Sequence, residues 1–152
     1  MNDTQSPHGT SRIGMNLAYF NIASETLSLA DITRITGEDA DKGWSVGEMY
    51  RLPRMVIERP RRASTWTRYS SAGYGLSVQL SLDGLYGHVE RIADRVASQH
   101  ELICSVQIVQ YVSNPAAEIG FNVDRRWLTL LASIDASLDV DQYRDDPSDS
   151  HG

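Results

Sequence analysis

The chain has 152 residues, 41% of them apolar, and a formal net charge of −6 at pH 7. This length fits a single domain that buries about 70% of the surface exposed by its unfolded chain. The negative charge argues against non-specific binding to nucleic acid or anionic lipid, because phosphate contacts need a basic face.

The sequence also bears on location. No run approaches the ~20 apolar residues that span a bilayer, and the polar start has neither the basic nor the apolar region of a secretory signal. Cys104 is the one cysteine and lies in an apolar run, which predicts a buried structural thiol in a reducing compartment. We expect a cytoplasmic protein without membrane contact. Thirteen of the fourteen basic residues are Arg, which we interpret as the coding bias of a GC-rich bacterial genome.

The composition divides the chain into a disordered polar arm (1–13), a single α+β domain (14–143) and an acidic disordered tail (144–152). The domain opens with an alternating stretch over 15–22 that is typical of a central strand. A helix over 29–36 should follow. Its start is indicated by Ser28 and Asp31, which can form a capping box, and its end by Gly37, which enters the left-handed conformation without strain.

The middle of the chain predicts shorter elements. We expect a short strand over 54–58, then a hairpin whose strands span 64–69 and 76–80 around a Gly- and Ser-containing loop. A second helix should begin near Asp83, because apolar residues then recur at helical spacing on one face: Leu85, Val89, Ile92 and Val96.

The last third predicts strand, turn, strand, helix and strand. The first strand begins at Leu102, the turn is Asn114-Pro115, and the second strand covers 117–123. Asp124 can cap the helix. Together these elements favour an α+β two-layer sandwich, with a mostly antiparallel sheet and helices packed on one face.

Several motifs occur in an order that resembles a bacterial family, domain of unknown function 4279 (DUF4279). They are Tyr19-Phe20-Asn21-Ile22, Leu29-Ala30-Asp31-Ile32-Thr33 with Gly37, Gly43-Trp44-Ser45-Val46-Gly47-Glu48, Ser64-Thr65-Trp66-Thr67 and the closing stretch 131–143. The segment 53–81 departs most from the family pattern. The resemblance implies a fold and no established activity, so it supplies no catalytic residues.

Asp139, Asp141 and Tyr143 form the first group of candidate binding residues. Residues two apart on a strand project from the same face, so the two carboxylates and the phenol should be aligned. Charged residues on an exposed strand also prevent edge-to-edge aggregation. Solvation, contact with a partner and acid–base catalysis therefore remain open for this group.

An arginine-rich segment forms the second group. Between Arg51 and Arg68 there are six Arg against one Glu, a local balance of +5. Arg61, Arg62 and Arg68 flank Trp66, and guanidinium groups interleaved with an aromatic ring can bind phosphate or stack on bases. Pairing with acids of the same chain is the alternative.

Trp44, Glu48 and Trp66 complete the candidates. A Trp beside Gly47 and Glu48 can line a ligand groove or an interface, but Trp is also common in cores, with its N–H bonded to a backbone carbonyl. The four His are scattered, and we find no nucleophile beside a base and no dinucleotide loop. We therefore expect no catalytic residues, no metal and no cofactor.

Three functions remain at this point. The leading hypothesis is a non-catalytic binding protein that recognises a protein partner, for example as an immunity protein or anti-effector, and that is itself a monomer or homodimer. The second is a sensor of an anion or nucleotide that uses the Arg/Trp segment. The third is an enzyme with an unfamiliar site.

Overall fold

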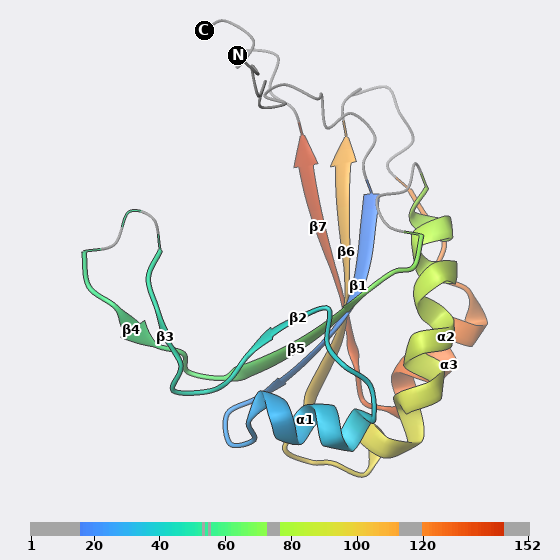
Figure 1. Ribbon diagram of the computed structural model, residues 1–152. Helices are drawn as coiled ribbons and strands as arrows, with labels where there is room; N and C mark the ends of the chain where they lie inside the picture. Colours follow the sequence, from blue (N-terminus) through green and yellow to red (C-terminus); the bar gives the residue numbers. More distant parts are fainter. Residues whose placement is uncertain (1–15, 53, 55, 73–76, 113–119, 145–152) are drawn as a thin grey trace, which may run out of the picture.

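The computed structural model describes residues 16–52, 54, 56–72, 77–112 and 120–144. These residues form one five-stranded sheet, one two-stranded hairpin and three helices (Figure 1). The sheet contains β1 (Asn16–Ser24), β2 (Lys42–Trp44), β5 (Ser64–Tyr69), β6 (Ile103–Val112) and β7 (Ser137–Arg144). The hairpin pairs β3 (Met49–Tyr50) with β4 (Arg59–Pro60), and the helices are α1 (Leu29–Thr36), α2 (Val78–Ala97) and α3 (Arg125–Ser133).

The sheet has the order β2-β5-β1-β6-β7, with β1 at its centre. Strand β1 pairs antiparallel with β5 and β6, and β2 pairs antiparallel with β5. Only the β6–β7 pair is parallel among the described strands, because α3 carries the chain back across the sheet between them. The predicted α+β class and mostly antiparallel sheet are confirmed.

The core contains the even-numbered side chains at the centre of β1, namely Ala18, Phe20 and Ile22. Buried side chains of all three helices join them, including Ile32 of α1, the apolar stripe of α2 and Trp127 of α3. The odd-numbered residues of β1 are only partly buried and do not belong to this core. One face of β1 therefore packs in the core, and the other remains partly exposed to solvent.

Two local predictions are confirmed. Ser28 accepts a hydrogen bond from the backbone of Asp31, whose side chain accepts one in return from the backbone of Ser28, and Gly37 ends α1 with a φ of 70°. Cys104 is buried, and this burial raises the pKa of its thiol to about 11. The thiol therefore stays protonated near neutral pH.

The strand predicted over 54–58 is wrong. Its described residues form turns and bends, and the chain pairs only at Arg59 and Pro60. Pro60 has no N–H to donate, and a two-stranded hairpin tolerates this because its outer edge carries no ladder.

The strand predicted over 76–80 is also wrong, because α2 begins at Val78. Ser77 caps the helix by accepting hydrogen bonds from the backbone of Gln79 and Leu80. The apparent alternation of apolar residues there reflects a buried Val78 and an exposed Leu80 on two sides of one helix.

Other expectations fall partly outside the described residues. These include the arm over 1–13, the turn at Asn114-Pro115, most of the strand over 117–123 and the tail predicted over 144–152, whose first residue, Arg144, instead ends β7. In the described remainder of that strand, Gly120 to Val123 form no strand. The helix that Asp124 caps and the final strand are as predicted. No helix within the described ranges combines the length and the apolar character needed to cross a membrane.

Gly84 lets α2 approach the segment that follows β5. A Cβ built on Gly84 would lie 2.6 Å from the Ser70 hydroxyl and 2.8 Å from the Ala72 backbone nitrogen. The backbone of Ser71 also donates a hydrogen bond to the Gly84 carbonyl, at 3.2 Å. The glycine is therefore required by a close backbone contact, despite its low helix propensity.

We predict that Gly84→Ala lowers the free energy of unfolding by about 1–3 kcal/mol, because the added methyl forces this contact apart. Gly87 is the matched control, since its added Cβ would meet only the end of Arg91, at 3.8 Å. Gly87→Ala should instead raise stability by up to about 1 kcal/mol through helix propensity. Urea unfolding of the two variants measures both effects, and equal stability of the two would contradict this role of Gly84.

Candidate functional site

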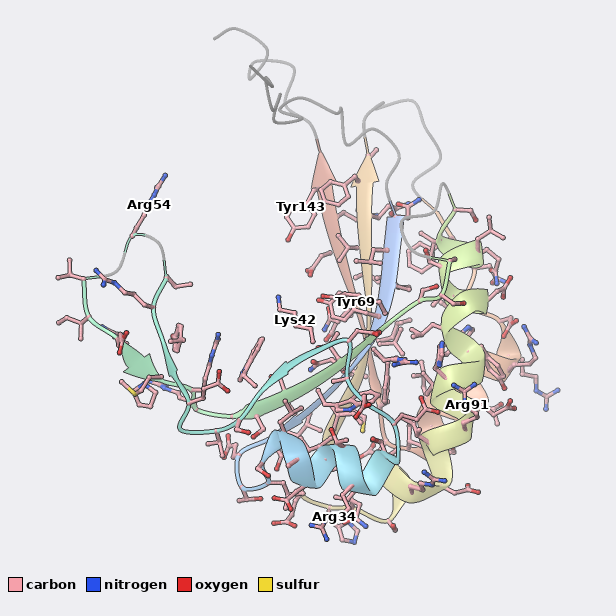
Figure 2. All side chains as sticks on the ribbon, in the orientation of Figure 1. Arg34, Lys42, Arg54, Tyr69, Arg91 and Tyr143 are labelled. Carbon is pink, nitrogen blue, oxygen red and sulfur yellow. The ribbon has the colours of Figure 1, made fainter. Side chains whose placement is uncertain are left out.

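The face of the sheet that carries the odd-numbered side chains of β1 has a groove lined by polar and aromatic side chains from four strands. We call this surface the open face; its groove is lined by Tyr19, Asn21, Lys42, Trp44, Thr65, Thr67, Tyr69 and Gln107. Figure 2 shows Lys42 and Tyr69 on the side of the sheet away from α2, from which Arg91 extends. The same alternation that places Phe20 in the core places Tyr19 here.

The open face continues onto β7. Gln107 donates a hydrogen bond from Nε2 to Oδ2 of Asp139 over 2.7 Å. Tyr143 stacks on Tyr111, with ring centroids 5.2 Å apart. The candidates Asp139, Asp141 and Tyr143 therefore share one exposed strip on the edge strand of the sheet.

Tyr19, on the central strand β1, lies between the β2 end of the open face and its β7 end. Its ring meets that of Tyr69 edge to face, with centroids 5.7 Å apart. The pKa of Tyr19 is raised above its ordinary value, first by burial and then by the negative charge of Asp141 and neighbouring groups. The phenol therefore remains a hydrogen-bond donor at neutral pH.

At the other end of the open face, the guanidinium of Arg61 lies between two aromatic rings. Its central carbon is 4.1 Å from the ring centroid of Trp44 and 4.1 Å from that of Tyr50. We call this arrangement the Arg61 sandwich. The backbone of Arg61 is fixed by hydrogen bonds to Glu48 and Gly47, of 2.8 and 2.9 Å.

The remaining candidates near this end have separate positions. Arg62 is exposed and lines the same groove as Arg61. Glu48 is exposed, and its carboxylate accepts a hydrogen bond from the backbone of Ser45 at 3.0 Å. Glu48 therefore stabilises its own turn through side chain and backbone.

Trp66 and Arg68 lie on the opposite face of β5. Trp66 belongs to the core and donates from Nε1 to the carbonyl of Glu38 at 3.2 Å, so a ligand on the open face does not reach it. Arg68 donates to the carbonyl of Asp39 at 3.0 Å and pairs with Asp41 at 3.5 Å. The arginine-rich segment thus divides: Arg68 pairs internally, whereas Arg61 stacks on aromatic rings.

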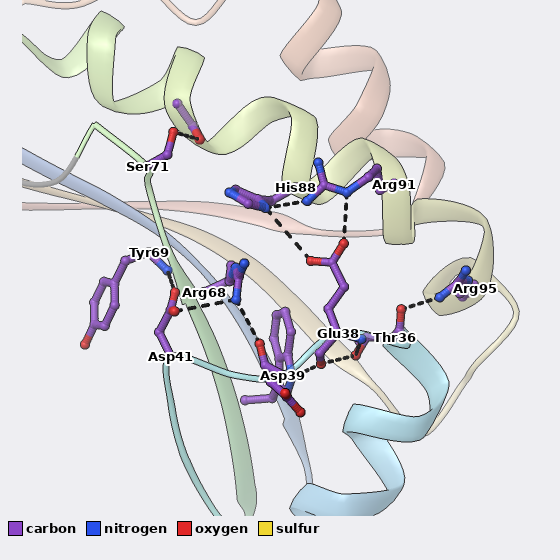
Figure 3. A network of polar contacts seen from close by, with 12 residues as sticks. Thr36, Glu38, Asp39, Asp41, Arg68, Tyr69, Ser71, His88, Arg91 and Arg95 are labelled. Atoms are coloured by element: carbon purple, nitrogen blue, oxygen red, sulfur yellow. Dashed lines mark hydrogen bonds and ion pairs between the residues drawn. The ribbon is translucent and has the colours of Figure 1, made fainter.

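A polar network joins the segment after α1 to α2 (Figure 3). Arg91 donates from Nε to Glu38 at 2.9 Å, and its terminal nitrogen contacts Nδ1 of His88 at 2.6 Å. The pKa of His88 is lowered, first by burial and then by the positive charge of Arg68 and Arg91, while Glu38 and Asp41 act in the opposite sense. A neutral His88 accepts the hydrogen bond from Arg91.

This shift predicts a pH dependence of stability. The unfolded chain protonates His88 near its ordinary pKa of 6.5, whereas the folded protein does so only at lower pH. Between these two pKa values the unfolded state binds more protons, so stability is fully present above the unfolded pKa and declines as the pH falls below it.

His88→Gln should make the loss of stability between about pH 7 and 5 shallower, because Gln still accepts from Arg91 and takes up no proton. Thermal unfolding across this range provides the measurement. His100→Gln, at an exposed position, is the control and should follow the wild type. An unchanged slope in His88→Gln would contradict the role of this histidine.

The structure brings the sequence candidates together as two clusters on one face. Trp44, Arg61 and Arg62 form one cluster, and the strip on β7 forms the other. Tyr19, Tyr69 and Gln107 connect them and were missed by sequence reasoning, as was Tyr50. The missed signal was the alternation itself, because Tyr19, Tyr69 and Gln107 occupy odd positions of β1, β5 and β6.

A search of the described residues for three or more His, Cys, Asp or Glu side chains able to hold one metal ion finds none. In a comparison with protein families, residues 12–145 of the chain match the model of a domain of unknown function, DUF4279. The chain belongs to this family. No curated protein and no solved structure matches the chain.

Proposed function

We propose that this DUF4279 protein is a cytoplasmic, non-catalytic binding protein that recognises a protein partner. The observation that carries the proposal is the β3–β4 hairpin, meaning the described residues between Met49 and Pro60. It extends from the β2–β5 side of the sheet, away from α2 and α3 (Figure 1). Arg54 lies at its tip (Figure 2).

The hairpin exposes an unusual amount of apolar surface. Val56 is 88% exposed and Ile57 is 70% exposed, and Met49 and Leu52 are each more than half exposed. Large exposed apolar patches mark interaction surfaces, because isolated soluble proteins tend to bury such side chains. Val56 and Ile57 together support a contact in which the hairpin inserts its apolar residues into a partner.

The residues around the hairpin have the composition of an interface. Arg, Tyr and Trp are enriched among residues that dominate binding energy, and Arg61, Tyr50 and Trp44 lie at the hairpin base. At the opposite edge of the sheet, Asp139 and Asp141 present carboxylates that favour encounter with a basic partner surface. The proposed partner therefore offers an apolar pocket to the hairpin and cationic groups to β7.

The apolar contact is tested by co-purification from the native host. We expect the double variant Val56→Ser/Ile57→Ser to lose the proteins retained by the wild type, with affinity lowered on the order of tenfold or more. Its melting temperature should be unchanged, because both side chains are exposed. Leu80→Ser/Leu128→Ser, at two exposed helical positions, is the matched control and should retain them. Recovery of the same proteins by both double variants would contradict a role for the hairpin.

The charge contribution is tested separately with the recovered partner. Asp139→Lys/Asp141→Lys should slow association, and the wild-type rate should fall as salt increases. Glu90→Lys/Asp94→Lys makes the same change in net charge at exposed positions of α2. If both pairs slow association equally, net charge rather than the β7 carboxylates is responsible.

A further inference from the structure

We propose that the groove beside the Arg61 sandwich binds a small anion bearing a phosphate group. This inference concerns a soluble ligand; the groove shares Arg61, Tyr50 and Trp44 with the proposed protein interface, but the ligand can be tested without the protein partner. The groove has a volume of about 470 Å³, which falls within the ~300–1,000 Å³ typical of small-ligand sites. Its wall combines the rings of Trp44 and Tyr50 with three arginines, Arg59, Arg61 and Arg62.

The orientation of Arg61 is suited to an oxyanion. Its two flat faces are covered by aromatic rings at 4.1 Å each, so its hydrogen-bond donors are directed along the edge of the plane. A guanidinium edge presents paired N–H groups whose spacing matches two oxygens of a phosphate. Nε of Arg61 is buried without a hydrogen-bond partner among the described residues, and an oxyanion would supply acceptors at this guanidinium.

The site is also fixed before a ligand arrives. The backbone of Arg61 both donates to Glu48 and accepts from Gly47. With its guanidinium held between two rings, Arg61 loses little side-chain freedom on binding. Preorganisation of this kind increases affinity because less ordering accompanies binding.

The local charge supports the same ligand class. Among described residues, those lining the groove include no Asp or Glu. Arg34, Arg68, Arg91 and Arg126 all form ion pairs with carboxylates, whereas the described part of the chain offers none to Arg59 or Arg62. Lys42 Nζ adds positive charge 6.0 Å from the Trp44 ring centroid. Although the whole chain carries −6, this groove concentrates cations.

Tryptophan fluorescence provides a direct readout. Trp66 and Trp127 are 1% and 0% exposed, whereas Trp44 is only partly buried and contacts Arg61. A ligand at Arg61 should therefore change the emission of Trp44. We expect a saturable change with ribose 5-phosphate at constant ionic strength, and none with ribose or chloride.

Arginine variants test whether the anion binds at the Arg61 sandwich. Arg61→Ala should abolish the response, and Arg61→Lys should weaken it on the order of tenfold, because an ammonium keeps the charge and loses the planar fork. Arg62→Ala, at an exposed position, should also weaken binding and serves if Arg61→Ala fails to fold. Arg125→Ala removes the same charge at an exposed position of α3 and should bind like the wild type. Thermal unfolding of each variant checks folding, and calorimetry gives its affinity.

The possible results either support the anion site or overturn it. Equal affinity for inorganic phosphate and ribose 5-phosphate would identify the free oxyanion as sufficient, and tighter binding of the ester would show contacts to its organic part; both support the site. No saturable change with either anion, an equal response to chloride, or undiminished binding in correctly folded Arg61→Ala and Arg62→Ala would overturn it. None of these results depends on recovery of a protein partner.

Discussion

Strand β1 is hydrogen-bonded on both sides, to β5 and β6, so its side chains can meet only the two faces of the sheet. Its even-numbered residues Ala18, Phe20 and Ile22 lie in a core shared with all three helices. Among its odd-numbered residues, Tyr19 and Asn21 line the groove of the open face. A shift of one residue in pairing would exchange these two sets and place a tyrosine and an amide in the core. The two-faced composition of β1 therefore determines both the register of the sheet and the position of the candidate site.

The proposed functional features lie at the edges of this sheet, outside its packed core. The Arg61 sandwich lies beyond the β2 edge, where the chain leaves the sheet to form the β3–β4 hairpin. The carboxylates of Asp139 and Asp141 lie on β7 at the opposite edge. Because Tyr69, Tyr19 and Gln107 connect the two, one continuous surface presents cations and apolar groups at one end and carboxylates at the other. A surface with opposite charges at its two ends would fix the orientation of the proposed partner, which a surface of one charge sign would not do.

The features that were predicted correctly depend on residues close together in the sequence. The capping box of Ser28 and the cap of Asp124 were predicted because each depends on residues three positions away. The start of α2 was misplaced because Val78 and Leu80 alternate as they would in a strand, and only the Ser77 cap and the close approach of Gly84 to Ala72 distinguish a helix. The Arg61 sandwich could not be predicted, since it needs two separate strand pairings: β3 with β4 places Tyr50 beside the segment of Arg61, and β2 with β5 places Trp44 there. Trp66 and Trp44 look alike in sequence, and strand register alone sends one to the core and the other to the open face.

Hydroxyl-radical footprinting of the intact protein, read by mass spectrometry, tests the central claim that one face is packed and the other, with the hairpin, is accessible. The structure predicts strong oxidation of Tyr143, Val56 and Ile57 and measurable oxidation of Trp44. It predicts protection of Trp66, Trp127 and Phe20, which are fully buried. Oxidation of Trp66 to the same extent as Trp44, or protection of Tyr143 and Val56 in the isolated protein, would contradict the account.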